Sequence, residues 1–213
     1  MFPADPAAPL AAGLPSRPGI ILDRDGTLID VVRDEETGTV SVAFHPDQVR
    51  LLPGVVEGLR ALAAAGYGFA LASNQPGPAK GQYSALAVER TNRALVELLA
   101  QSGIDIPVVE VCMHHPDGGP GGDARLVGDC VCRKPKPGLL LNAIARAGFD
   151  PTRTWMLGDS AADVAAARNA NLRSALVFPT NRCEICPLRA GPNVQPDLVA
   201  ARFDELAQAI LRS

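Results

Sequence analysis

The sequence predicts an α/β fold, in which a parallel sheet is covered by helices on both faces. Short apolar runs alternate with segments of helical period from residue 19 to the end of the chain. Such alternation is typical of parallel sheets, because a helix usually carries the chain across a face of the sheet between two strands. A length of 213 residues is enough for one domain with a full core. Hydrophobic residues make up 47% and aromatic residues only 4%, so we expect an aliphatic core.

Five strands are predicted from apolar runs that are bounded by polar or turn-forming residues. In chain order they are 20–22, 69–72, 108–111, 154–157 and 175–178. Helices are predicted where apolar residues recur every three or four positions. In chain order they are a helix with Val55, Leu59 and Leu62 after Pro53-Gly54, a helix over 88–99, one that starts at Pro137 and carries Leu140, Ile144 and Ala147, one over 161–171, and a terminal helix with Phe203, Leu206 and Ile210. Proline suits the first turn of a helix because it has no N–H to lose there.

Three segments fall outside this alternation. Residues 1–18 are rich in Pro and Ala and are predicted to be a disordered tail, followed by a single domain over 19–213. Residues 29–52 are polar and contain the turn Thr37-Gly38-Thr39, so we expect a small hairpin over the site. Residues 113–136 are rich in Gly and Pro and are predicted to form a long loop.

Charge and hydropathy exclude several classes of protein. The net charge is −3 and there is no basic run, so nucleic acid is not an expected partner. No apolar stretch approaches the ~20 residues that span a bilayer. The first eighteen residues lack the basic start and apolar stretch of a signal peptide. Five Cys is an odd number and they cluster, which indicates a reducing compartment and metal ligation. We therefore expect a cytoplasmic monomer that does not contact a membrane.

Two acidic residues directly follow the first predicted strand, in Asp23-Arg24-Asp25-Gly26-Thr27. Residues i and i+2 of an extended chain point the same way, so Asp23 and Asp25 should project into one space beyond the strand. Open α/β sheets bind ligands at this carboxyl edge. Two carboxylates so close repel each other unless a cation or a proton lies between them. Taken alone, the pattern would also fit a loop with two solvated acids.

Three other segments end strands or begin helices with reactive groups. Ser73-Asn74-Gln75 follows the second strand, and its hydroxyl and N–H groups can hold a phosphate oxygen. In Arg133-Lys134, Lys134 can neutralise phosphate charge and Arg133 can bind two oxygens. Gly158-Asp159 ends the fourth strand, and Asp163 lies one helical turn further on. Taken singly, these would fit a polar turn, a basic turn and a helix cap with a surface acid.

All four segments are expected on one edge of a parallel sheet, which predicts a site for Mg²⁺ and phosphate. Magnesium needs an octahedral set of oxygen ligands and keeps several waters. A carboxylate beside it can attack phosphorus and form an aspartyl-phosphate. A second carboxylic acid can protonate the leaving alkoxide and then activate water.

Two closely spaced pairs, Cys112-x-His114 and Cys130-x-Cys132, flank the long loop. Alternation along the chain places the members of each pair on one side. Three thiolates and one imidazole make a closed tetrahedral zinc site of the structural type, which leaves no water position for catalysis. His115 is the alternative ligand. Buried Cys and a surface His without metal is the alternative interpretation.

Zinc at this place would tie residues 113–132 together and fix Arg133 and Lys134. The remaining pair, Cys183-x-x-Cys186, lies in a loop after the fifth strand. Its spacing fits half of a metal site or a redox pair. No further ligands are evident nearby in the sequence, so two free surface thiols is the favoured interpretation.

These motifs give the chain a resemblance to the haloacid dehalogenase superfamily of phosphatases, between about residues 19 and 178. Its four motifs are matched, in order, by Asp23-x-Asp25-Gly26-Thr27, Ser73, Lys134 and Gly158-Asp159-x-x-x-Asp163. The resemblance implies a Rossmann-like fold, with Asp23 as nucleophile and Asp25 as general acid/base. It implies Mg²⁺ ligands from Asp23, the Asp25 carbonyl and Asp159, with Asp163 behind them. The implied phosphate-binding residues are Ser73, Asn74, Arg133 and Lys134.

The cysteine-rich region resembles one branch of that superfamily. The matching segments are Cys112-x-His114-His115-Pro116, Cys130-x-Cys132-Arg133-Lys134-Pro135-Lys136-Pro137-Gly138, Asn74-Gln75-Pro76-Gly77 and Lys80-Gly81. The branch contains D-glycero-D-manno-heptose 1,7-bisphosphate phosphatases and histidinol-phosphate phosphatases. It implies no large cap domain and removal of the C7 phosphate from a heptose bisphosphate.

The expected function is therefore that of a Mg²⁺-dependent phosphomonoesterase acting on a sugar bisphosphate. The alternatives are a histidinol-phosphate phosphatase and a catalytically silent, metal-stapled binding protein of the same fold. Three departures from the family pattern concern the substrate end of the site. Ser160 stands where a Lys is usual, Ile29 stands where the heptose enzymes have polar residues, and residues 30–52 are longer.

Overall fold

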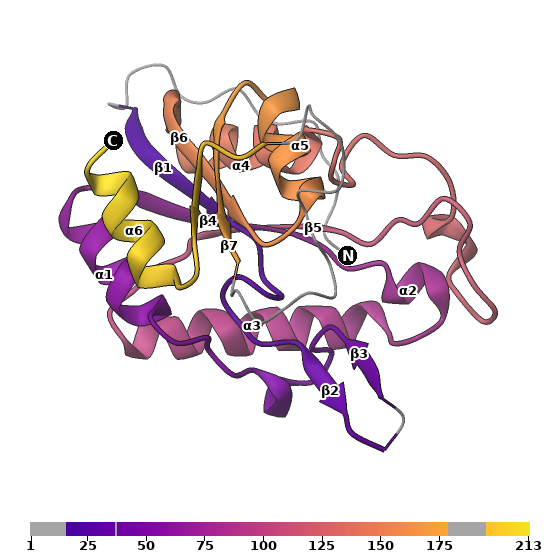
Figure 1. Cartoon of the computed structure of the whole chain (residues 1–213). Coiled ribbons are helices and arrows are strands. Elements are labelled where there is room, and N and C mark those ends of the chain that lie inside the picture. The colour runs from indigo at the N-terminus through magenta and orange to yellow at the C-terminus, as the bar shows by residue number, and fades with distance from the viewer. Residues whose placement is uncertain (1–15, 37, 179–194) are drawn as a thin grey trace.

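The computed structural model describes residues 16–36, 38–178 and 195–213. Cys183 and Cys186 lie outside these residues. At the centre is a six-stranded parallel sheet with the order β5-β4-β1-β6-β7-β8 (Figure 1). Its strands are β1 (Arg17–Leu22), β4 (Gly68–Asn74), β5 (Val108–Cys112), β6 (Phe149–Gly158), β7 (Arg173–Val177) and β8 (Leu198–Ala200). The five predicted strands are confirmed. β8 has only three residues and lies at the edge, so its sequence carries little signal.

Helices cover both faces of the sheet, as predicted. One face carries α1 (Val55–Ala64), α3 (Ala85–Gln101) and α6 (Phe203–Leu211), and the other carries α4 (Gly138–Ala147) and α5 (Ala161–Asn169). The central strand shows how the two cores are divided. Ile20 and Leu22 point into the first core, whereas Ile21 between them points into the second. A fully apolar strand is what a sheet buried on both faces requires.

The segment between β1 and α1 forms the expected hairpin. β2 (Val32–Asp34) and β3 (Thr39–Ser41) pair in antiparallel fashion and project away from the sheet (Figure 1). A 3-10 turn, η1 (Pro46–Gln48), follows. The chain then returns to the site, because Ile29 bridges to both Asp25 and Leu51. The hairpin is thus anchored at the carboxyl edge of β1.

Several predicted boundaries differ from the structure. β1 begins at Arg17, so the domain starts before residue 19, and α5 ends at Asn169 rather than 171. Ser73 and Asn74 are the last residues of β4 instead of a loop after it. The 113–136 segment, predicted to be a loop, contains a 3-10 turn, η2 (Ala124–Leu126). A short helix that was not predicted, α2 (Gly77–Lys80), follows β4. Among the described residues no helix is long and apolar enough to cross a membrane.

Candidate active site and metal centre

The first feature of the site is a buried lysine that joins two carboxylates. Lys134 Nζ donates to Asp23 Oδ1 at 2.7 Å, to Asp163 Oδ1 at 2.6 Å and to the Ala72 carbonyl at 2.8 Å. Only 4% of Lys134 is exposed. Burial alone would lower the pKa of Lys134, but the charges of Asp163 and Asp23 outweigh it and raise that pKa. The ammonium therefore stays charged at any physiological pH.

Backbone geometry brings the ends of β1 and β6 together. Asp23 N–H donates to the Leu157 carbonyl at 2.8 Å, which continues the pairing of the two strands to the sheet edge. Gly26 follows with a φ of +81°, and a Cβ there would collide with Oδ2 of Asp159. Only glycine tolerates both the positive φ and this close approach. The glycine of this turn therefore allows Asp159, after β6, to lie close to Asp23 and Asp25, after β1.

Asp23, Asp159 and Asp163 form a group whose oxygen atoms lie within 4.8 Å of one another. Burial raises the pKa of Asp159 to about 8, and the negative charges of Asp23 and Asp163 add to that rise. Burial also raises the pKa of Asp23 to about 6, against the opposing effect of Lys134. Crowded, buried carboxylates of this kind need a cation or a proton between them.

The group fits Mg²⁺. Oxygen ligands at about 2.1 Å in an octahedron are about 3 to 4 Å apart, a spacing this group can supply. Asp163 is otherwise engaged, because it bonds Lys134 and receives hydrogen bonds from the Ser160 N–H and hydroxyl. Its contacts thus hold Lys134 and the start of α5.

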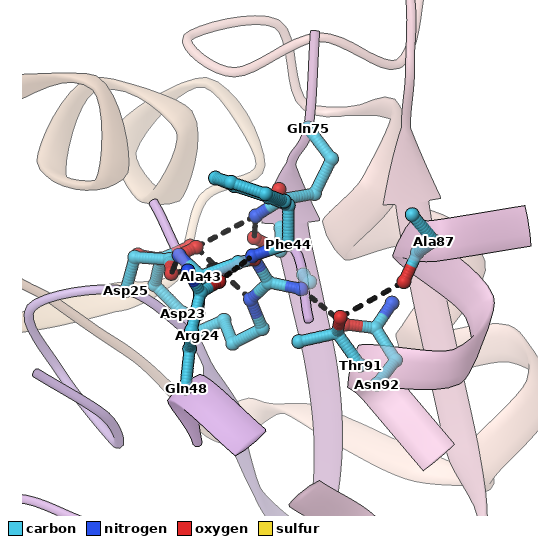
Figure 2. Close-up of polar contacts among 12 residues, drawn as sticks. Asp23, Arg24, Asp25, Ala43, Phe44, Gln48, Gln75, Ala87, Thr91 and Asn92 are labelled. Carbon is cyan, nitrogen blue, oxygen red and sulfur yellow. Dashed lines mark hydrogen bonds and ion pairs between the residues drawn. The ribbon is translucent and has the colours of Figure 1, made fainter. Parts of the chain in front are cut away.

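The carboxylate of Asp25 lies in a separate, closed hydrogen-bond network (Figure 2). Its Oδ1 accepts from Ala43 N–H at 3.1 Å and from Arg24 Nη2 at 3.3 Å. Its Oδ2 accepts from Arg24 Nε at 3.0 Å and from Gln75 Nε2 at 2.7 Å. Residues from the hairpin segment and from the end of β4 therefore meet at this one carboxylate.

The predicted phosphate-binding residues lie around the carboxyl edge of the sheet, and they differ in their hydrogen-bond partners. Ser73 is buried and its hydroxyl accepts from Gln75 Nε2 at 3.0 Å. Asn74 exchanges two hydrogen bonds with the backbone of Lys134, at 2.9 and 3.0 Å. Its amide thus holds the lysine in place. Arg133 donates from Nη1 to the His114 carbonyl at 3.2 Å, which links it to the cysteine cluster.

Cys112, His114, Cys130 and Cys132 come together as predicted, with their ligand atoms within 4.8 Å of one another. Cys112 Sγ lies 3.7 Å from both His114 Nδ1 and Cys130 Sγ, and Cys132 Sγ lies 3.5 Å from His114 Nδ1. A tetrahedral zinc site with Zn–S bonds of about 2.3 Å has ligand separations of about 3.8 Å, so the arrangement fits zinc.

Electrostatics at this cluster also favour a metal. Cys132 Sγ lies 3.1 Å from Cys112 Sγ, and the hydrogen bond between them lowers the pKa of Cys132 to about 5, so one thiolate forms readily. His115, the alternative ligand, lies outside the group. Its Nδ1 accepts from the N–H groups of Asp117 and Gly118, at 3.2 and 3.1 Å, and so stabilises the loop instead.

The motifs do not predict the roles of three residues in the Asp25 network. These are Arg24, Gln75 as a hydrogen-bond donor to Asp25, and Asn92. Asn92 carries one sequence signal, because it shares a helix face with Val88, Leu95 and Leu99, all buried. A polar residue on an apolar stripe needs a buried partner. The sequence offers no means of identifying that partner as Arg24, 68 positions away.

Comparisons with known proteins agree with the fold and the motifs. A protein-family model described as HAD-hydrolase-like matches residues 131–206. The chain is 34% identical over 163 residues to D-glycero-beta-D-manno-heptose-1,7-bisphosphate 7-phosphatase of Pasteurella multocida, covering 76% of this chain and 82% of that protein. It is 38% identical over 197 residues to D-glycero-D-manno-heptose-1,7-bisphosphate 7-phosphatase of Thermosynechococcus vestitus, covering 91% and 94%.

A solved structure matches over nearly the whole length. It is D,D-heptose 1,7-bisphosphate phosphatase from B. bronchiseptica, complexed with magnesium and phosphate, with a TM-score of 0.71 and 28% identity. The match covers 92% of this chain and 98% of that one. The alignments with the two heptose bisphosphate phosphatases span most of this chain and most of each relative. The chain therefore belongs to the D-glycero-D-manno-heptose-1,7-bisphosphate 7-phosphatase family of haloacid dehalogenase-like hydrolases.

Proposed function

We propose that this protein is a Mg²⁺-dependent phosphomonoesterase that removes the 7-phosphate from D-glycero-D-manno-heptose 1,7-bisphosphate. The observation that carries the proposal is Lys134 Nζ held between Asp23 and Asp163 at the carboxyl edge of the sheet. A buried ammonium next to a carboxylate can hold a phosphoryl group while the carboxylate attacks it. Family membership supports the choice of substrate.

In this proposal Asp23 is the nucleophile. One of its oxygens forms a bond to phosphorus while the bond from phosphorus to the sugar oxygen breaks. The carboxylic acid of Asp25 gives its proton to the departing sugar oxygen. The resulting Asp25 carboxylate then takes a proton from water, which attacks the phosphoaspartate and regenerates Asp23. Phosphate and the dephosphorylated sugar are the products.

The remaining residues bind and position the reacting groups. Ser73 and Lys134 hold the phosphoryl oxygens, and Asn74 fixes the backbone of Lys134. Asp23, the Asp25 carbonyl and Asp159 would hold Mg²⁺, which would supply positive charge to the phosphoryl oxygens. Asp163 orients Lys134. Arg133 directly precedes Lys134 in the chain, and its guanidinium is suited to binding a second phosphate.

We assign a structural role to zinc at Cys112, His114, Cys130 and Cys132. The Arg133 N–H donates to Cys130 Sγ at 3.4 Å. The Arg133 side chain also bonds the His114 carbonyl. A metal that fixes these ligands would therefore fix Arg133 and the adjoining Lys134. The four protein ligands would fill the tetrahedral positions of the zinc, which would leave no position for a catalytic water.

A panel assay tests the proposal. Phosphate release is measured with purified protein and Mg²⁺ on both anomers of the heptose bisphosphate and on histidinol phosphate. We expect the highest kcat/KM on a heptose bisphosphate. A preference for histidinol phosphate would overturn the substrate assignment but keep the reaction. No phosphate release from any ester, with both metals present, would overturn the proposal as a whole.

A further inference from the structure

The guanidinium of Arg24 is completely buried, with 0% of the residue exposed. A buried cation is stable only when a counter-charge and hydrogen-bond acceptors surround it. Arg24 meets this requirement through Asp25, to which Nε and Nη2 donate at 3.0 and 3.3 Å. The two donors reach the two different oxygens of the carboxylate, so the pair fixes the orientation of Asp25.

Arg24 is itself held from two further sides (Figure 2). Nη2 donates to the Ala43 carbonyl at 2.5 Å, and Nη1 donates to Asn92 Oδ1 at 2.7 Å. Asn92 belongs to α3, a helix of seventeen residues packed on the sheet, whereas Ala43 belongs to the segment after the hairpin. Asn92 is thus the contact that ties Arg24 to a long, packed element.

Each oxygen of Asp25 already accepts two hydrogen bonds. A leaving-group oxygen that receives a proton from Asp25 must take the place of one of these donors. The Ala43 N–H and the Gln75 amide are neutral, and the Arg24 donors are charged. Charged hydrogen bonds are about twice as strong, so Arg24 stays in place while a neutral donor yields. Arg24 would then keep the Asp25 carboxyl group in place during proton transfer.

We infer that Asn92 is a positioning residue for proton transfer: through Arg24 it fixes the carboxyl group of Asp25 relative to the leaving-group oxygen. This inference rests on the proposed function, in which Asp25 is the general acid. Asn92 bonds Arg24, a residue to which the proposed function gives no part in binding substrate or metal. Its effect on Asp25 passes through the side chain of Arg24, which Asn92 holds from the buried face of α3.

The test compares two leaving groups. A sugar alkoxide needs a proton as the phosphate ester bond breaks, whereas p-nitrophenolate leaves without one, and kcat/KM reports this first step. Asn92→Ala should lower kcat/KM for heptose bisphosphate about 10-fold, a fraction of the 10²–10⁴-fold that acid–base catalysis contributes. For p-nitrophenyl phosphate the change should stay within about 2-fold. Asn92→Asp keeps the acceptor for Arg24 and should recover most of the lost activity.

Thr91 provides a matched control. It is the neighbouring residue on α3 and is also fully buried, but its hydroxyl donates to the Ala87 carbonyl at 2.8 Å, within the helix (Figure 2). Thr91→Val removes this hydrogen bond and should change neither substrate's kcat/KM. Equal losses on both substrates in Asn92→Ala would indicate general damage to the fold. No loss on either would equally overturn the inference.

A readout independent of turnover separates this inference from the proposed function. The Nε–H resonance of Arg24 is assigned in NMR spectra by its loss in Arg24→Lys. It should be protected from water exchange in the wild type and in Thr91→Val, and unprotected in Asn92→Ala. Protection that survives in Asn92→Ala would overturn the inference. If the wild type cleaves neither ester, the proposed function fails, and this measurement still decides whether Asn92 holds Arg24.

Discussion

Nζ of Lys134 lies 2.7 Å from Oδ1 of Asp23, although 111 positions of the chain separate the two residues. The same Nζ also bonds Asp163, and Asp159 completes the group of acids. Three carboxylates thus face one ammonium, which leaves an excess of negative charge that a divalent cation can balance. The charges of this group therefore suit a divalent cation such as Mg²⁺.

Removal of the lysine should destabilise the fold. Lys134→Met leaves Asp23 and Asp163 without their shared cation, and breaking a buried ion pair typically costs about 3–5 kcal/mol. Urea unfolding at neutral pH measures this loss. Lys136→Met is the control, because Lys136 is 48% exposed and its ion pair with Asp129, at 3.3 Å, lies at the surface. That variant should change the free energy of unfolding by less than about 1 kcal/mol. Similar values for both variants would contradict the proposed burial of charge.

Replacing the two β1 acids should stop turnover at different steps. Asp23→Asn should abolish phosphate release, because an amide does not form the phosphoenzyme. Asp25→Asn should lower the rate of sugar phosphate hydrolysis by about 10²–10⁴-fold, since only proton transfer is lost. Rapid-quench measurement of protein-bound phosphate distinguishes them, with a phosphoenzyme expected only where Asp23 is present. Substantial turnover by Asp23→Asn would exclude the aspartyl-phosphate mechanism.

The position of these acids is the part of the site that follows most directly from sequence. Parallel strands are apolar along their whole length, so their ends are sharp, and the polar residues that follow must lie on one edge of the sheet. Asp23 and Asp159 become neighbours for this reason, because they directly follow β1 and β6. Lys134 follows no strand: it lies in the loop before α4, and its long side chain reaches the edge from there. The cysteine pairs are predictable on similar grounds, because each pair is local and the metal demands a fixed number of ligands.

The Asp25 network could not be predicted in the same way. Its contacts depend on where the hairpin segment returns and on how α3 packs, and neither is encoded by a short motif. Asn92 shows only as a polar residue on an apolar stripe. Asn74 illustrates a related limit. Its residue type suits phosphate binding, but its amide is used to hold the backbone of Lys134, a partner that only tertiary structure reveals.

Stabilisation by Mg²⁺ should increase with pH. The pKa of Asp159 is raised to about 8 by burial and by its acidic neighbours, compared with about 4 in an unfolded chain. Without metal, the folded state keeps a proton that the unfolded state releases, so stability falls as pH rises from about 4 to about 8. Mg²⁺ replaces that proton. The rise in Tm on adding Mg²⁺ should therefore be larger at about pH 9 than at about pH 6. Asp159→Asn should remove most of this rise, and a rise that is equal at both pH values would contradict the assignment.

Zinc should co-purify with the protein at about one ion per chain. Cys130→Ser removes one thiolate ligand and should lose the metal, lower thermal stability and reduce turnover through displacement of Arg133. Elemental analysis of untagged protein and thermal unfolding provide the measurements. His115→Ala is the control that should keep zinc, because His115 contacts backbone N–H groups outside the cluster. Normal zinc content and stability in Cys130→Ser would refute the structural site.

The choice of a bisphosphate substrate should depend on Arg133. With Ser160 in place of the usual Lys, one cation expected near the substrate is missing, so the remaining cations carry more of the recognition. Arg133 has a planar guanidinium that suits two-pronged phosphate binding, and its Nη1 donates to the His114 carbonyl at 3.2 Å. A charge-assisted hydrogen bond contributes about 1.5–3 kcal/mol.

Arg133→Ala should therefore lower kcat/KM for the heptose bisphosphate by about 10- to 100-fold. A small generic phosphate ester has no second phosphate to lose contact with, so its kcat/KM should change by less than about 3-fold. Lys136→Ala, three residues further along the same turn, tests whether position alone matters, because Lys136 is the other nearby cation. Equal losses on both substrates in Arg133→Ala would place Arg133 at the transferred phosphate. A selective loss in Lys136→Ala instead would transfer recognition of the second phosphate to that residue.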